Sequence, residues 1–300
     1  MAWIQIKATV NETLADPLSD AFSEQGAASV TFADAADQPI FEPELGTTPI
    51  WQRTQVIALF DAATDVDALL TQVLAAPTLP DSPGLVKSDF TIEPLEDKDW
   101  VRAWMDAFEP MQFGQRLWIV PSWHQPPDPQ AVNLMLDPGM AFGTGTHPTT
   151  ALCLQWLDAH SPVDQSVVDY GCGSGVLALA ATKLGARSVS GTDIDPQAIR
   201  ASRDNAERNQ ADITFELVED FEATSPQPAD LVIANILAGP LKSLRPNFQS
   251  LLKPEATLVL SGLLTTQVDD LLDDYTRHGF QCLAHNTLED WSQLTLQAPS

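Results

Sequence analysis

The chain has 300 residues and 44% of them are hydrophobic, which is enough to bury a core in each of two domains. Aspartate and glutamate number 41 against 15 lysines and arginines, so the net charge is −26 and direct binding to a nucleic-acid backbone is disfavoured. The three cysteines and five histidines lack the spacing of metal ligands, and no stretch approaches the ~18 apolar residues that span a bilayer. We therefore expect a cytoplasmic protein without a metal site.

The first domain is predicted at residues 1–95. Alternation and helical spacing indicate an α+β order of strand, helix, strand, strand, helix, strand, which is the ferredoxin-like plan. This part carries 14 acidic and three basic side chains, a net charge of −11. One interpretation of this charge is that the domain binds a basic partner. A solvated acidic surface without a partner explains the charge equally well. The expected elements are strands at 3–10, 28–32, 55–60 and 90–94 and helices at 14–25 and 66–75.

A linker helix is predicted at residues 96–115. Trp100, Trp104 and Phe108 recur at every fourth position, which places three aromatic rings on one helical face. Such a face more often packs against a domain than binds a substrate. The second domain is then expected at residues 116–300.

Strands and helices alternate from Ser166 onward, which predicts an α/β domain with a parallel sheet. Ligands of such sheets bind at the carboxyl ends of the strands. We also expect an antiparallel edge formed by residues 281–283 and 293–296. The expected parallel strands are 167–169, 188–192, 214–218, 231–234 and 257–261, and the helices lie near 176–184, 196–208, 239–252 and 265–278.

A glycine-rich turn follows the first of these strands. Gly171, Gly173 and Gly175 allow a tight turn and a close approach of a ligand to the backbone. Asp193 ends the next strand, where a carboxylate can accept hydrogen bonds from ribose hydroxyls. The spacing is G-x-G-x-G and not the G-x-G-x-x-G of dinucleotide folds, which argues against a dehydrogenase. It resembles the first motif of S-adenosylmethionine-dependent methyltransferases.

A second glycine-rich loop covers residues 140–150 and opens a helix at 151–159. Its threonines can cap the helix, and its glycines let the loop lie against a ligand. A capped turn without a ligand is the simpler alternative. We predict a lid or substrate contact at Phe142, Gly143 and Thr144.

The motifs AFGTGTHPTT, DYGCGSG, GTDIDP, ANILAGPL and LSGLL together resemble the bacterial methyltransferases of the large-subunit ribosomal protein L-eleven. The resemblance covers roughly residues 97–297. It implies a class I (Rossmann-like) methyltransferase domain that methylates lysine side chains and the N-terminal amine of that basic protein, held by the N-terminal domain. By similarity, the residues that contact S-adenosylmethionine are Thr150, Gly171, Gly173, Asp193 and Asn235.

Asn235 follows the fourth parallel strand, where the methyl acceptor is expected to enter. Its side-chain oxygen can orient an amine, although an asparagine can also end a strand for turn reasons alone. Related amino-group methyltransferases place an aromatic residue just after this position, and this chain has Ile236, Leu237 and Ala238. A flexible aliphatic amine therefore fits better than a nucleobase. A methyltransferase of another protein or small amine, or a non-enzymatic S-adenosylmethionine-binding module, remain the alternatives.

Overall fold

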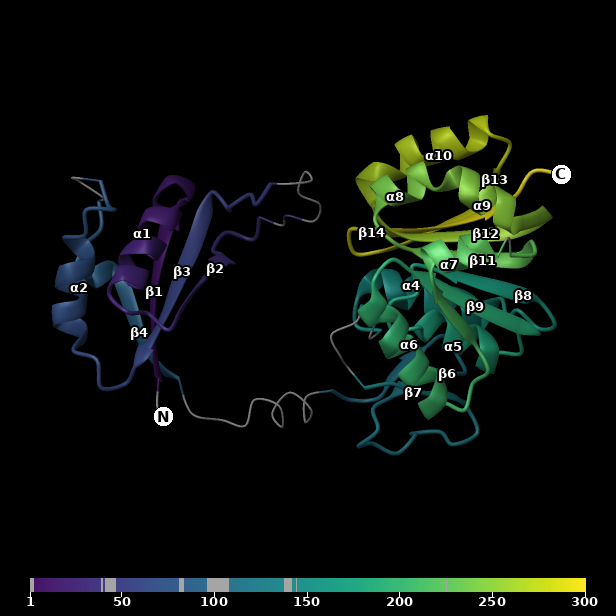
Figure 1. Ribbon diagram of the computed structural model, residues 1–300, viewed down its shortest axis with the longest axis horizontal. Coiled ribbons are helices and arrows are strands. Elements are labelled where there is room, and N and C mark those ends of the chain that lie inside the picture. Colours follow the sequence, from purple (N-terminus) through teal and green to yellow (C-terminus); the bar gives the residue numbers. More distant parts are fainter. Residues whose placement is uncertain are drawn as a thin grey trace. The chain divides into compact units, whose positions relative to one another are not determined.

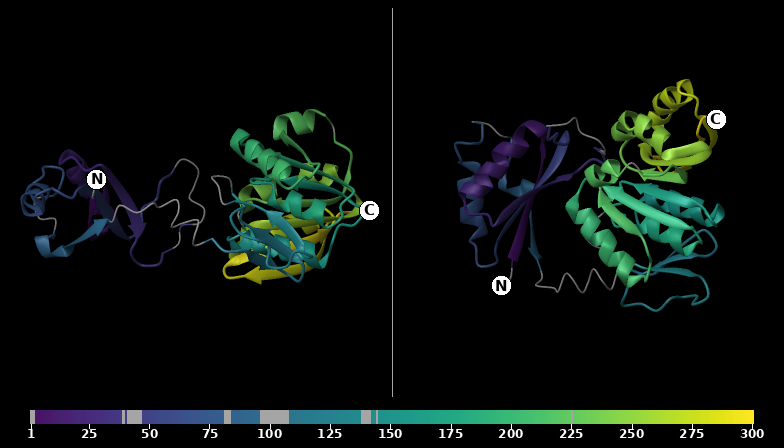
Figure 2. Two further views of the ribbon diagram at one scale, coloured as in Figure 1. Left: turned by 90° about the horizontal axis from the view of Figure 1, so that it is seen from below. Right: turned by 45° about the vertical axis from the view of Figure 1, so that its right-hand side comes forward.

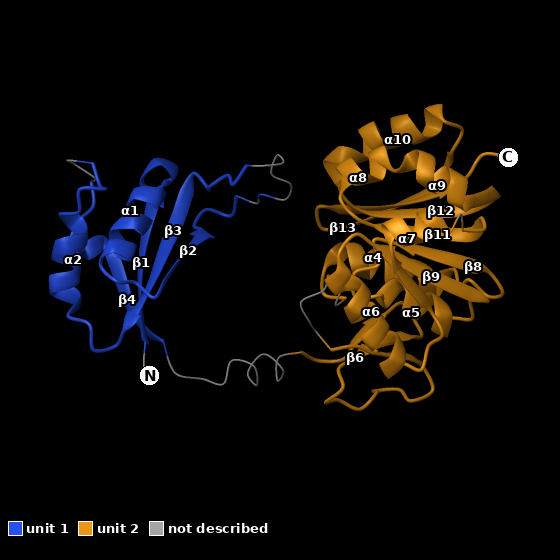
Figure 3. Ribbon diagram, in the orientation of Figure 1, with its two compact units in different colours: residues 1–105 blue, residues 106–300 orange. Residues whose placement is uncertain are grey.

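The computed structural model describes residues 3–38, 40, 47–80, 84–95, 108–137, 142–143, 145–224 and 226–300. The chain forms two compact units, residues 1–105 and 106–300, which Figure 3 colours separately. The first unit has a hydrophobic cluster of its own, and the second has two.

The first unit is a four-stranded antiparallel sheet with two helices. The strand order is β2-β3-β1-β4, which confirms the ferredoxin-like prediction. Ile6 and Phe60 on the sheet pack with Phe22 of α1 and Leu69 of α2, so both helices cover one face. Figure 1 shows this unit in purple and blue. Its elements are β1 (Trp3–Asn11), α1 (Glu12–Glu24), β2 (Ser29–Asp34), β3 (Arg53–Asp61), α2 (Val66–Leu74) and β4 (Phe90–Leu95).

The second unit is built on a seven-stranded sheet of order β10-β9-β8-β11-β12-β14-β13. The first five strands run parallel, and β14 lies antiparallel between β12 and β13. The predicted parallel sheet with an antiparallel edge is confirmed. Its strands are β8 (Ser166–Tyr170), β9 (Ser188–Asp193), β10 (Thr214–Leu217), β11 (Ala229–Asn235), β12 (Leu252–Leu264), β13 (Gln281–Leu288) and β14 (Trp291–Gln297).

Helices cover both faces of this sheet, as the two views in Figure 2 show. Alternate residues of a strand face opposite sides, so Val167 and Ile233 belong to one core cluster while Val168 and Val232 belong to the other. The first face is covered by α4 (Pro148–Ala159), α5 (Val176–Lys183) and α6 (Pro196–Arg208), and the second by α7 (Val218–Ala223), α8 (Ala238–Ser243), α9 (Arg245–Leu251) and α10 (Val268–Arg277).

A small three-stranded sheet packs into the core cluster on the α4 and α5 side through Leu117, Ile119 and Leu134. Of the linker helix predicted at 96–115, residues 96–107, including Trp100 and Trp104, lie outside the described residues. The end of that range forms a strand because it pairs antiparallel with β6. The strands are β5 (Met111–Phe113), β6 (Leu117–Val120) and β7 (Val132–Met135).

The structure also differs from the expectations for two further elements. The helix predicted at 239–252 is divided into α8 and α9, because Pro246 lies in the first turn of α9 and cannot continue a helix without losing a hydrogen bond. The strand predicted at 214–218 ends at Leu217, and the short helix α7 begins directly after it.

No helix in the described ranges is long and apolar enough to cross a membrane. Within those same ranges, no three His, Cys, Asp or Glu side chains gather as metal ligands.

Candidate functional site

The glycine turn joins β8 to α5 and is held against the end of β9. The Gly171 and Cys172 backbone N–H groups both donate to the Thr192 carbonyl, at 2.8 and 3.0 Å. Gly175 is the residue that precedes α5, and its φ of 77° is left-handed, a conformation that a side chain disfavours. The first backbone N–H groups of α5 therefore point toward the carboxyl edge of the sheet.

Asp169 lies beneath this turn and is only 1% exposed. Its Oδ2 accepts a hydrogen bond from the Ala178 N–H at 2.9 Å, which ties α5 to the end of β8. Burial raises the pKa of Asp169 to about 7; the Ala178 N–H opposes this shift, and the Asp193 carboxylate adds to it. The charge of this carboxyl group therefore changes near neutral pH.

Asp193 ends β9 and reaches back to the glycine turn. Its Oδ2 accepts from the Gly173 N–H at 2.9 Å, and its Oδ1 accepts from the Asp195 N–H at 3.0 Å. A carboxylate has about four acceptor positions, so each oxygen can take a further hydroxyl. The next side chain, Ile194, is 84% exposed. An apolar side chain in solvent beside a fixed carboxylate is suited to cover a flat ring, and the sequence patterns missed it.

The second glycine-rich loop lies directly on the glycine turn. The Phe142 carbonyl accepts from the Ser174 N–H at 2.8 Å, and the Gly143 carbonyl accepts from the Ser174 hydroxyl at 2.7 Å. A Cβ atom on Gly173 would lie 2.6 Å from the Phe142 oxygen, so only glycine fits there. Thr144 lies outside the described residues.

Asn235 and Thr150 meet at the end of β11. The Asn235 amide nitrogen donates to the Thr150 hydroxyl at 3.2 Å, and the Ser261 hydroxyl of β12 donates to the Thr149 carbonyl at 3.2 Å. Asn235 is 9% exposed, yet its Oδ1 has no hydrogen-bond donor among the described residues. A buried acceptor without a donor costs about 1–3 kcal/mol, so this oxygen is placed to receive a donor from a ligand.

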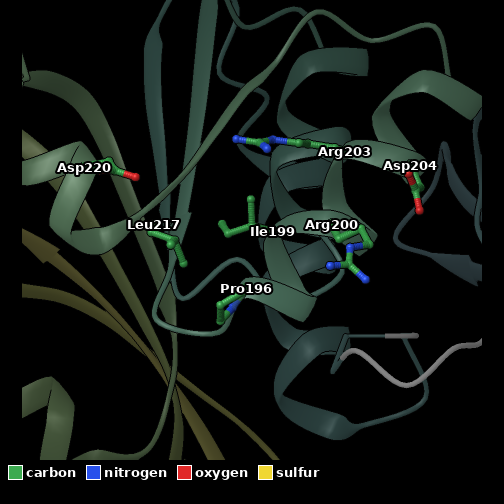
Figure 4. A pocket seen from close by; sticks show the side chains of 7 residues that line it. All are labelled: Pro196, Ile199, Arg200, Arg203, Asp204, Leu217 and Asp220. Atoms are coloured by element: carbon green, nitrogen blue, oxygen red, sulfur yellow. The ribbon is translucent and has the colours of Figure 1, made fainter.

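A pocket of about 330 Å³ adjoins the carboxyl ends of β9 and β10. In Figure 4, Leu217 and Asp220 lie on one side of it and Pro196 and Ile199 of α6 on the other. The Arg203 Nε donates to the Phe215 carbonyl at 3.2 Å, which ties α6 to β10. The sequence patterns did not predict this pocket.

The structure thus groups the predicted site residues into neighbouring sets at one edge of the sheet. Gly171 and Gly173 lie with Asp193, Phe142 and Gly143 at the ends of β8 and β9. Thr150 lies with Asn235 at the end of β11, which pairs with β8 in the sheet.

Comparison with known proteins identifies the family of the chain. Residues 2–299 match the protein-family model of ribosomal protein L11 methyltransferase (PrmA). The chain belongs to this family. It is a methyltransferase that uses S-adenosylmethionine, and its sheet is the class I methyltransferase sheet that the motifs predicted.

Individual relatives agree along nearly the whole chain. The ribosomal protein L11 methyltransferase of Hydrogenovibrio crunogenus is 66% identical over 295 residues, with 98% of each chain covered. That of Azotobacter vinelandii is 53% identical over 295 residues, with 97% of each chain covered. The solved structure of the ribosomal protein L11 methylase from Lactobacillus delbrueckii subsp. bulgaricus is 32% identical to this chain, with a TM-score of 0.59. The alignment of the two covers 64% of this chain and 100% of the methylase chain.

Proposed function

We propose that this methyltransferase transfers methyl groups from S-adenosylmethionine to lysine side chains and the N-terminal amine of ribosomal protein L11, in the cytoplasm. The observation that carries the proposal is the buried Asn235 oxygen without a donor, next to Thr150 and one strand away from the glycine turn. An amine N–H group is the donor that this oxygen lacks.

The residues around the glycine turn fit the cofactor. Gly171 and Gly173 give the turn its left-handed backbone angles, Asp193 retains acceptor positions for two ribose hydroxyls, and the exposed Ile194 can cover the adenine ring. Thr150 and Asn235 would hold the end that carries the methyl group. When bound, the cofactor supplies a methyl group activated on a sulfonium.

The acceptor amine must be neutral and aligned. A lysine with an ordinary pKa near 10.4 loses its proton at a cost of about 4.6 kcal/mol at pH 7, whereas an α-amine near 8 costs only about 1.4 kcal/mol. The Asn235 Oδ1 accepts one amine N–H and thereby directs the lone pair without acting as a strong base. Phe142, carried by a loop on the glycine turn, can exclude water from this space.

The acidic first unit suits a basic protein substrate. Residues 1–95 carry a net charge of −11, which attracts a basic protein and repels a nucleic-acid backbone. We therefore assign substrate recognition to the predicted domain of residues 1–95 and expect no direct contact with RNA.

Transfer of labelled methyl groups tests this function. The purified chain is incubated with methyl-labelled S-adenosylmethionine and, separately, with ribosomal protein L11, another basic ribosomal protein, a small aliphatic amine and RNA. We expect label in L11 alone. Label in the small amine at a comparable rate would contradict the assigned substrate, and no transfer to any acceptor would contradict the activity.

Asp193→Ala is expected to weaken binding of S-adenosylmethionine. Each charge-assisted hydrogen bond to a ribose hydroxyl contributes roughly 1.5–3 kcal/mol to the binding free energy. A water molecule that takes the place of the carboxylate in the variant would restore part of this contribution. Calorimetry measures the affinity, and Asp212→Ala is a control with the same change of charge in an exposed loop. Unchanged cofactor affinity in Asp193→Ala, or tight binding of NAD by the unaltered chain, would rule out this assignment.

A further inference from the structure

Three aromatic rings gather beside the site at the start of α4. The centroids of His147 and Trp291 are 4.8 Å apart with an interplanar angle of 68°, and those of Phe142 and His147 are 5.4 Å apart at 60°. Phe142 is 55% exposed, so a ring of this group faces open space. His147 and Trp291 are partly buried, so Phe142 is the exposed member of the group.

The backbone places this group close to the acceptor position. His147 immediately precedes α4, and Thr150, which contacts Asn235, lies one helical turn further along. Ser261 pairs with Asn235 in the sheet register, and Trp291 of β14 pairs with Leu264 at the end of the same strand, β12. Phe142 is held on the glycine turn by its carbonyl.

The imidazole of this group caps α4. Its Nδ1 accepts the Thr149 N–H at 3.3 Å as the cap of α4, so a proton on Nδ1 would remove the cap. Burial lowers the pKa of His147, against the opposing effect of the Glu289 carboxylate. The group is therefore an aromatic surface with the Glu289 carboxylate near His147.

We propose that Phe142, His147 and Trp291 form an aromatic wall that receives the cationic side chain of the acceptor lysine before and after methylation. The inference rests on the proposed function and names how the substrate is held. A cation within ~6 Å of an aromatic face is attracted by the ring quadrupole, most strongly by tryptophan, and methylated ammonium groups bind to such surfaces. Glu289 adds attraction for the same charge.

Two small probes separate the charge from the shape of the acceptor. N-acetyl-trimethyllysine methylamide carries a permanent positive charge, and its isostere with carbon in place of the charged nitrogen is neutral. Binding to the full chain is followed by fluorine NMR after incorporation of 5-fluorotryptophan, with the Trp291 signal assigned from its loss in Trp291→Phe. We expect the cation to bind roughly fivefold more tightly than the isostere.

Variants show whether Trp291 is responsible for this preference. Trp291→Leu should bring the ratio of affinities close to one, and Trp291→Phe should leave an intermediate ratio because the smaller ring has a weaker quadrupole interaction. Trp156→Phe is the matched control, because Trp156 stacks on His160 at the other end of α4, with centroids 4.8 Å apart. The ratio of the two probe affinities for Trp156→Phe should equal that of the unaltered chain. Binding to Trp291→Leu and Trp291→Phe, which lack the fluorinated ring at this position, is followed by NMR signals of protein methyl groups.

Several results would overturn the proposal. These are equal affinity of both probes for the unaltered chain, binding of neither probe, or a fivefold preference that persists in Trp291→Leu. None of these measurements requires methyl transfer. A chain that shows the preference and fails to methylate ribosomal protein L11 would therefore contradict the proposed function and leave the aromatic wall in place.

Discussion

Deletion of residues 1–95 is expected to abolish methylation of ribosomal protein L11 and to leave the affinity for S-adenosylmethionine largely unchanged. The first unit has its own hydrophobic cluster, and the glycine turn, Asp193 and Asn235 all belong to elements of the second unit. Calorimetry measures cofactor affinity of the truncated chain, and labelled methyl transfer measures its activity.

The deletion removes a surface of net charge −11 that would otherwise attract the basic substrate. The separately produced residues 1–95 serve as the complementary sample and should bind ribosomal protein L11 in a salt-sensitive manner. Full methylation by the truncated chain would show that the second unit recognises the substrate by itself. Loss of cofactor binding would show that the units are not independent.

Asn235→Ala is expected to lower the methylation rate by about ten- to a hundredfold at saturating cofactor and substrate, which corresponds to the loss of one orienting hydrogen bond in the transition state. The change also frees the Thr150 hydroxyl from its contact at 3.2 Å, so cofactor affinity should fall as well. Single-turnover kinetics at saturating cofactor separates the two effects.

Thr150→Ser is the matched control for Asn235→Ala, because it retains the hydroxyl group that the Asn235 amide contacts. We expect it to methylate close to the rate of the unaltered chain. If Asn235→Ala also reaches that rate once cofactor is saturating, Asn235 only binds the cofactor. The orienting role would then belong to the backbone carbonyls beside it.

Local sequence patterns were sufficient for the parts of the site that depend on neighbouring residues. Gly171, Gly173 and Gly175 are recognisable because each needs a left-handed backbone angle between a strand and a helix. Asp193 and Asn235 are recognisable because each is the last residue of a parallel strand, and all such strand ends share one edge. The ferredoxin-like order followed from the alternation of apolar and polar residues in the same way.

Other features depend on contacts between distant segments and left no local signal. The contact of His147 with Trp291 forms only when β14 is inserted beside β12. Strand β12 begins at Leu252, where it pairs with β11, well before the predicted residue 257. The prediction began too late because the sequence Lys253-Pro254 resembles a loop. Ile194 resembles an ordinary apolar residue in the sequence, and only its 84% exposure distinguishes it.

The mass of ribosomal protein L11 from cells tests the central claim most directly. L11 is isolated from cells that lack this chain and from the same cells supplied with the unaltered chain, with Asn235→Ala or with Asp193→Ala, and its tryptic peptides are analysed by mass spectrometry. We predict that methyl groups on lysine and N-terminal amines are absent without the chain, are restored by the unaltered chain, and are reduced with either variant. Methyl groups that persist on L11 in cells lacking the chain, at the level of unaltered cells, would contradict the account.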